Sequence, residues 1–268
     1  MNHPAPAVEI RPAATLMLVR DGVDGMEVLM LRRHPDSVFA ADAWVFPGGA
    51  VDPADGEVAP EAVLGTTDRE ASATIGVPSG GLAFFVAAIR ECFEEAGVLL
   101  ARAAGGAALD VSSDLDATRF ARHRRDVLTG RRTLAQVLDA EDLVLDLGTV
   151  FYVSHWITPP GPPRRFDTRF FLAPAPFGQT ATHDTAETVE SAWTTPARAL
   201  ERRAAGEIHL VFPTIKNLEA LARFPASANL LAAASAIDSV PRVAPRFGGD
   251  TLIPAAALHD SGEPTCPT

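Results

Sequence analysis

Arg90-Glu91-Cys92-Phe93-Glu94-Glu95-Ala96-Gly97-Val98 is the stretch that decides the fold of this chain. The residues around it are rich in Ala, Leu, Val and Phe, and Gly97 is placed to end a helix. On that helix Glu91, Glu94 and Glu95 share one face, where three like charges repel one another. A hard divalent cation, which prefers carboxylate oxygens, is therefore expected beside them. A solvated acidic helix face is the alternative explanation.

A second signal lies upstream, in Trp44-Val45-Phe46-Pro47-Gly48-Gly49-Ala50-Val51-Asp52. This pattern predicts a short apolar strand that ends at a proline and two glycines. Glycine pairs allow the backbone to approach a ligand or metal closely. An ordinary turn uses the same residues, so the information lies in the combination of the two segments.

Together the two segments resemble the Nudix box, Gly-x5-Glu-x7-Arg-Glu-U-x-Glu-Glu-x-Gly-U, where U is bulky and apolar. Gly49 matches the first glycine, and Arg90 to Val98 match the end of the box without a gap. The resemblance implies a Nudix α/β/α sandwich with a mixed sheet, a box insertion and extra C-terminal helices. The alternation of strands and helices along the chain independently indicates a mixed α/β sheet covered on both faces.

The spacing inside the box departs from the family pattern. About 40 residues separate Gly49 from Arg90, against about 13 in the family motif. Asp55 lies six residues after Gly49 and Leu82 lies eight before Arg90, and neither is assigned to the first box glutamate. The insertion, about residues 55–81, resembles the Nudix branch that includes the acyl-coenzyme A diphosphatases and their bacterial relatives.

The resemblance also implies roles for the site residues. The glutamates are expected to hold Mg²⁺ or Mn²⁺, since such a site offers only oxygen, and a carbonyl of the Gly48–Gly49 pair adds a further oxygen. Glu91 is expected to act as a ligand or as the general base. The expected catalytic residues are Glu91, Glu94, Glu95 and Arg90, and the expected metal ligands are Glu91, Glu94, Glu95 and Gly49.

Arginines are the expected phosphate contacts, because their forked guanidinium matches phosphate oxygens. Arg32 and Arg33 leave the second predicted strand, while Arg165 and Arg169 share one face of a later strand. A cross-strand ladder of ion pairs is the alternative role for any one of them.

A carboxylate outside the box is also expected near the metal. Asp184, Glu187 and Glu190 precede Trp193, and Glu187 and Glu190 are equally good candidates. A surface charge is the simpler explanation for each of the three. Core packing is favoured over ligand contact for the remaining candidates, Trp156, Phe166, His155 and Cys92.

Composition excludes several classes of function. The chain has 268 residues, 47% of them apolar, and a net charge of −11, which argues against general nucleic-acid binding. Two cysteines are too few for a disulfide framework, and no run is long enough to cross a membrane. These features predict a cytoplasmic protein whose partner is a small-molecule nucleoside diphosphate derivative.

The chain is expected to contain a loose segment (1–10), one Nudix domain (11–225) and a C-terminal appendage that is mostly coil (226–268). The insertion is predicted to be a loop with at most a short helix near Ala59–Leu64. Other predicted strands are 14–19, 27–31, 43–46, 149–157, 165–173 and 188–193, and other predicted helices are 113–129, 133–141, 196–205 and 214–224.

The predicted function is metal-dependent hydrolysis of a diphosphate linkage in a nucleoside diphosphate derivative, preferably coenzyme A or acyl-coenzyme A. The alternatives are an ADP-ribose, dinucleotide or nucleoside triphosphate pyrophosphohydrolase, and a Nudix-fold ligand sensor without turnover. Selectivity is expected in loops such as 55–81 and 158–164, so the sequence leaves the exact substrate open, as it does the oligomeric state.

Overall fold

The computed structural model describes residues 8–37, 40–184 and 187–245. A long hairpin, β1 (Ile10–Gly22) and β2 (Gly25–Arg33), begins the fold and is closed by a two-residue turn. Alternate residues of β1 face opposite sides of the sheet: Leu16 and Leu18 join one apolar core, and Met17 and Val19 join the other. The central sheet is therefore buried on both faces.

The central sheet is mixed. Its strand order is β11-β3-β2-β1-β9-β8-β12, while β10 pairs with β2 and β4 pairs with β1. The β1–β9 pair is parallel and the β1–β2 and β8–β9 pairs are antiparallel. The further strands are β3 (Ala43–Val45), β4 (Gly48–Ala50), β8 (Phe151–Ile157), β9 (Arg165–Pro174), β10 (Thr188–Thr194), β11 (His209–Leu210) and β12 (Arg242–Val243).

The two strands of the first hairpin separate, and the separation positions the glycine loop. β1 and β2 pair only as far as Val19 and Val28. Beyond that point β3 pairs with β2, and β4 pairs with β1 through Gly48 and Gly49. The segment 43–50 thus enters between the diverging strands and carries both glycines into the middle of the sheet.

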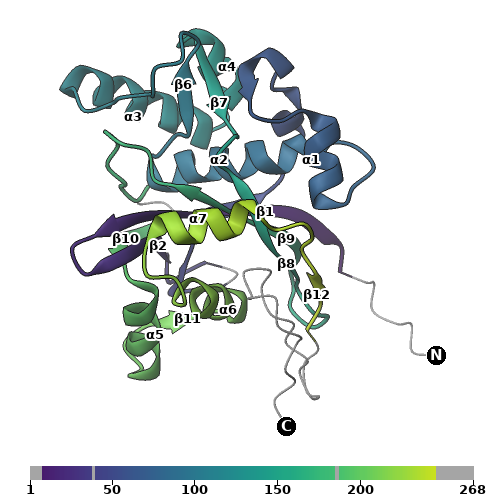
Figure 1. Cartoon of the computed structure of the whole chain (residues 1–268), viewed down its shortest axis with the longest axis vertical. Helices are drawn as coiled ribbons and strands as arrows, with labels where there is room; N and C mark the ends of the chain where they lie inside the picture. Colours follow the sequence, from purple (N-terminus) through teal and green to yellow (C-terminus); the bar gives the residue numbers. More distant parts are fainter. Residues whose placement is uncertain (1–7, 38–39, 185–186, 246–268) are drawn as a thin grey trace.

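Helices cover both faces of this sheet (Figure 1). On one side lie α1 (Asp68–Ile75), α2 (Leu82–Ala96), α3 (Asp114–Leu128), α4 (Leu134–Ala140) and a small sheet of β5 (Val63–Leu64), β7 (Leu143–Asp146) and β6 (Ala101–Ala103). On the other side lie α5 (Pro196–Ala204), α6 (Phe212–Leu221) and α7 (Ser227–Ser235). The expected α/β/α sandwich with a mixed sheet is confirmed.

Helix α2 packs against the sheet through a fully apolar face that includes Phe85, Ile89, Cys92 and Phe93. It ends at Gly97, whose φ of 72° is the left-handed conformation that favours glycine at a helix C-terminus. Burial raises the pKa of the Cys92 thiol, so this cysteine is an inert part of the core. The glutamates of α2 occupy its remaining face.

Two segments differ from their sequence predictions. The insertion contains two 3-10 helices (Pro53–Glu57 and Pro60–Ala62), strand β5 and helix α1, so a loop was the wrong prediction for most of it. Its helix begins at a capping box, in which Thr67 and Glu70 exchange hydrogen bonds.

The second difference is in the C-terminal appendage. Residues predicted to be coil form α7, because Leu230 and Ala234 pack into the second apolar core. Strand β12 then pairs with β8, and residues 246–268 lie outside the described residues, as do residues 1–7 of the predicted loose segment. No helix in the described ranges has the length and apolarity needed to cross a bilayer.

Candidate active site

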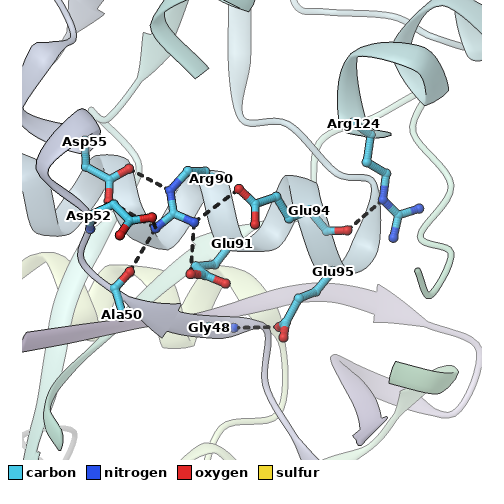
Figure 2. Close-up of polar contacts among 9 residues, drawn as sticks. All are labelled: Gly48, Ala50, Asp52, Asp55, Arg90, Glu91, Glu94, Glu95 and Arg124. Carbon is cyan, nitrogen blue, oxygen red and sulfur yellow. Dashed lines mark hydrogen bonds and ion pairs between the residues drawn. The ribbon is translucent and has the colours of Figure 1, made fainter. Parts of the chain in front are cut away.

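Arg90 stands at the centre of the candidate site (Figure 2). Its Nε and Nη2 donate to the two carboxylate oxygens of Asp55 at 2.7 and 3.1 Å, and Nη2 also donates to the Ala50 carbonyl at 2.8 Å. Its Nη1 donates to Glu91 at 2.9 Å and to Glu94 at 3.1 Å. The guanidinium therefore fixes two box glutamates and the loop after the glycines in one arrangement.

Asp55 is the residue that holds Arg90 in place. It is 2% exposed, and its Oδ2 also accepts the Asp52 N–H at 2.7 Å. Burial raises the pKa of Asp55, and its bonds to Arg90 oppose that rise. Burial would lower the pKa of Arg90, but its contacts with Asp55 and Glu91 raise it overall. The two bonds between the guanidinium and the carboxylate let each partner offset the cost of burying the other.

Glu95 points away from Arg90 and toward the glycine loop. Its Oε2 accepts the Gly48 N–H at 2.9 Å, and its side chain is almost completely buried. A Cβ at Gly49 would collide with the Glu91 carboxylate, and one at Gly48 would collide with Ala14 and Thr15. Gly48 is thus required by the close approach of the β1 backbone, and a side chain at Gly49 would displace the Glu91 carboxylate.

The box glutamates carry more negative charge than their surroundings neutralise. Burial raises the pKa of Glu91 to about 7 and raises that of Glu94. Burial and the Glu91 charge raise the pKa of Glu95 well above its ordinary value. Arg90 is the cation that contacts Glu91 and Glu94, and it is shared with Asp55. The site therefore gains stability from any additional positive charge.

The donor atoms fit a hard divalent cation, since they are all carboxylate or carbonyl oxygens. In the present side-chain arrangement, no three His, Cys, Asp or Glu groups of the described residues converge on a single ion position. The hydrogen bonds explain this, because Arg90 draws Glu91 and Glu94 toward itself while Gly48 holds Glu95. A cation would have to compete with Arg90 for these oxygens.

Comparisons with known proteins decide the family. Residues 56–221 match the domain family described as the NUDT19 Nudix domain. The chain belongs to the Nudix hydrolase family. The human protein named acyl-coenzyme A diphosphatase NUDT19 is 32% identical over 242 residues, covering 77% of this chain and 63% of that protein. Its chicken counterpart is also 32% identical, with 74% and 61% covered.

A solved structure extends the similarity. The Nudix hydrolase from Alicyclobacillus acidocaldarius is 33% identical, with a TM-score of 0.69, covering 84% of this chain and 96% of that one. The expected resemblance to a Nudix hydrolase is therefore confirmed. The chain spans less than two thirds of the length of the human and chicken relatives.

A cavity of about 1110 Å³ opens beside the Nudix box. Glu91, Glu94, Asp52 and both glycines line one end of it. Its other walls come from β3, β8, β9 and residues 209–214 on the opposite side of the sheet from the insertion. No described residue of the insertion, residues 55–81, lines the cavity.

Of the four arginines predicted to bind phosphate, the structure places only Arg33 in the lining of this cavity. The Arg33 Nε is buried and has no hydrogen-bond partner among the described residues, and its charge lowers the pKa of Glu95. Arg32 instead pairs with Asp42 at 2.8 Å and with Glu190 at 3.6 Å, in a separate surface pocket.

The other two predicted arginines lie on the face of β9 that points away from the cavity. Arg169 contacts Asp167 at 3.0 Å and lies over the ring of Phe84, while Asp167 also bonds His155 at 2.5 Å. Arg169 and Asp167 thus form the kind of ion-pair ladder that was the alternative role, and Arg165 donates to the Thr158 carbonyl. Their placement does not favour the predicted phosphate contact.

Two cavity-lining arginines, Arg11 and Arg164, were missed. Strand alternation contains the signal, because Phe166, Thr168 and Phe170 face the cavity and position 164 is in phase with them. The choice between the two phases of β9 could not be made from the sequence alone, since both carry arginine.

The structure separates the two downstream carboxylates that the sequence left equal. Glu187 lines the cavity with Glu91, and its charge raises the pKa of Glu91 and Glu95. Glu190 lies in the separate pocket with Arg32. The loop that carries Glu187 is fastened to the end of α2, where Arg124 donates to the Glu94 carbonyl and to Thr182.

Proposed function

We propose that this chain hydrolyses a diphosphate linkage in a nucleoside diphosphate derivative, with coenzyme A or acyl-coenzyme A as the preferred substrate and Mg²⁺ or Mn²⁺ as the required ion. Glu91 and Glu94, which are half-buried and line a large cavity, and the buried Glu95 beside the glycine loop carry this proposal. The names of the human and chicken relatives support the substrate class.

In the reaction, the oxygen of water forms a bond to phosphorus and the bridging P–O bond breaks, which releases two phosphate monoesters. With coenzyme A, the products are a 4′-phosphopantetheine species and 3′,5′-adenosine diphosphate. A divalent ion held by the box glutamates and a glycine-loop carbonyl would neutralise phosphate charge and lower the pKa of bound water. The protein must also position the substrate and receive the proton that water loses.

The residues of the chain divide these tasks. Arg90 fixes the rotamers of Glu91 and Glu94, so the carboxylates are organised before substrate arrives. Arg33 lines the cavity, and its guanidinium is suited to bind a phosphate oxygen there. Glu91, whose pKa is about 7, and Glu187 are the two groups suited to receive the proton.

A second candidate is hydrolysis of ADP-ribose, a dinucleotide or a nucleoside triphosphate by the same groups, because the box contacts only the diphosphate. A non-catalytic ligand sensor is disfavoured. Three clustered glutamates beside an anionic ligand would weaken its binding unless they held a cation.

The proposal is tested with a panel of substrates in Mg²⁺ or Mn²⁺, with products identified by mass. The panel contains coenzyme A, octanoyl-coenzyme A, ADP-ribose, a dinucleoside tetraphosphate and a nucleoside triphosphate. We expect cleavage of the coenzyme A species to be at least about tenfold more efficient than that of the others, and to stop with excess chelator. Brisk cleavage of ADP-ribose alone would favour the second candidate, and turnover in chelator would contradict the metal assignment.

A further inference from the structure

The cavity extends well beyond the glutamates, and its far part differs in chemistry. A volume of about 1110 Å³ slightly exceeds the usual range for small-molecule sites, about 300–1,000 Å³. A diphosphate and its ion would occupy only the acidic end. The remaining wall is formed mainly by aromatic, aliphatic and proline side chains, among them Val45, Trp156, Phe166, Leu210, Phe212 and Pro213.

This apolar wall is built by a fixed part of the fold. Trp156 is 2% exposed, and its indole N–H is already bonded to Ser154 at 2.7 Å. Phe212 packs edge-on against it, with ring centroids 5.7 Å apart. Strand β11, just before Phe212, pairs with β3, which leads directly into the Gly48–Gly49 loop. The wall is therefore held in register with the acidic end of the cavity.

Charged side chains such as Arg11, His34 and Arg164 also line the cavity, but the wall segment 210–213 carries only apolar side chains. Beside it, the Thr158 hydroxyl already accepts the Phe166 N–H. A purine base carries several donors and acceptors that need partners when buried. The alkyl chain of an acyl thioester needs no such partners and gains by burying apolar surface, whereas the two amides and the hydroxyl of the pantetheine part do need them. The wall is therefore better suited to an apolar arm than to the base.

We infer that the apolar wall around Trp156 and Phe212 is the subsite for the acyl chain at the end of the substrate's pantetheine arm, and that it sets selectivity for that chain. The inference rests on the proposed function and extends it to a side of the molecule that the insertion does not reach. It replaces the expectation that residues 55–81 select the substrate. No described residue of that segment lines the cavity. The turn at 158–164 contributes the outer edge.

The test measures binding and needs no hydrolysis. S-octanoyl-4′-phosphopantetheine, 4′-phosphopantetheine and AMP are titrated calorimetrically into the full chain with chelator present. We expect the octanoyl ligand to bind wild type at least about tenfold more tightly than the unacylated one, a difference of about 1.4 kcal/mol. Phe212→Ala should remove most of that difference, and Phe212→Leu, which keeps apolar bulk, should retain most of it.

Phe177→Ala is the matched control, because Phe177 is 93% exposed and does not line the cavity. It should leave all three affinities unchanged. Equal affinity for the acylated and unacylated ligands in wild type would overturn the inference. A larger effect of Phe212→Ala on AMP than on the octanoyl ligand would overturn it too, and would assign the wall to the base. Binding of the octanoyl ligand that depends on Phe212, without turnover of any acyl-coenzyme A, would uphold the subsite and reject the proposed reaction.

Discussion

The guanidinium of Arg90 and the carboxylate of Asp55 form two hydrogen bonds, of 2.7 and 3.1 Å, across 35 residues of chain. Asp55 follows Gly49 by six residues, which is the spacing of the first glutamate in the Nudix box. The extra residues therefore enter after Asp55, between it and α2. The contact between Asp55 and Arg90 joins the two ends of the insertion across the box.

This relationship predicts the effect of Asp55→Asn. The variant leaves the buried Arg90 without its bidentate partner, and breaking such a buried pair costs about 3–5 kcal/mol. We expect a loss of stability of that order and a fall in turnover, because the glutamate rotamers are no longer fixed. Chemical denaturation and steady-state kinetics measure the two effects. Glu61 is an exposed carboxylate in the same insertion, and Glu61→Gln should change neither stability nor turnover. An effect of Glu61→Gln as large as that of Asp55→Asn would contradict a specific role for the Asp55–Arg90 pair.

Glu94→Gln and Glu95→Gln are expected to lower turnover by at least about a hundredfold each, since each removes a charge that would hold the ion in the transition state. Both glutamines keep the size of the side chain, and at position 95 an amide oxygen can still accept the Gly48 N–H. The fold should therefore survive, as checked by circular dichroism. Activity within about threefold of wild type in either variant would place the metal elsewhere.

The sequence predicted the fold and the position of the candidate site, because both are marked by short contiguous motifs. The glutamate spacing on α2 and the glycine loop were visible because each is a contiguous motif. The partner of Arg90 was not assigned, because choosing Asp55 over Leu82 requires knowing where the insertion begins. The capping box of Thr67 and Glu70 was a readable signal for α1 that the Gly- and Pro-rich flanks obscured.

A second feature that the sequence did not reveal is which face of β9 lines the cavity. Arg165 and Arg169 share one face, but a strand pattern alone does not say which face meets the cavity. Phe166, which the sequence analysis interpreted as a core residue, lines the cavity. Tertiary pairing with β1 and β8 sets this phase, and it cannot be derived from local sequence.

The raised pKa of Glu91 predicts a pH dependence of stability in the metal-free protein. Folding raises this pKa from 4.5 to about 7, so between these values the folded state binds more protons than the unfolded state. Stability then falls as pH rises from about 5 to about 8. Urea denaturation in chelator measures this slope. Glu91→Gln should make it shallower and Glu61→Gln should not. Identical slopes in wild type and Glu91→Gln would contradict the raised pKa.

Added Mg²⁺ or Mn²⁺ should oppose that loss. An ion that binds only the folded state stabilises it by mass action, and it competes with protons for the same carboxylates. We expect the melting temperature to rise on addition of either ion at pH 8, and to rise much less at pH 5. Glu94→Gln should reduce the rise at pH 8. A rise at pH 5 as large as that at pH 8 would contradict carboxylate ligation.

The insertion is expected to support the fold and not to select substrate. The Thr67 hydroxyl accepts the Glu70 N–H, and the Glu70 carboxylate accepts the Thr67 N–H, so Thr67→Ala removes the cap of α1 at a cost of about 1 kcal/mol. The ratio of kcat/KM for octanoyl-coenzyme A to that for ADP-ribose should stay within about twofold of wild type, because no described residue of α1 lines the cavity. Thr66→Ala, which loses only a 3.3 Å bond to a neighbouring carbonyl, is the control and should be nearly neutral in stability. If Thr67→Ala shifted the substrate ratio more than about fivefold while Thr66→Ala did not, the insertion would take part in selection, and the apolar wall would not be the only element that reads the acyl arm.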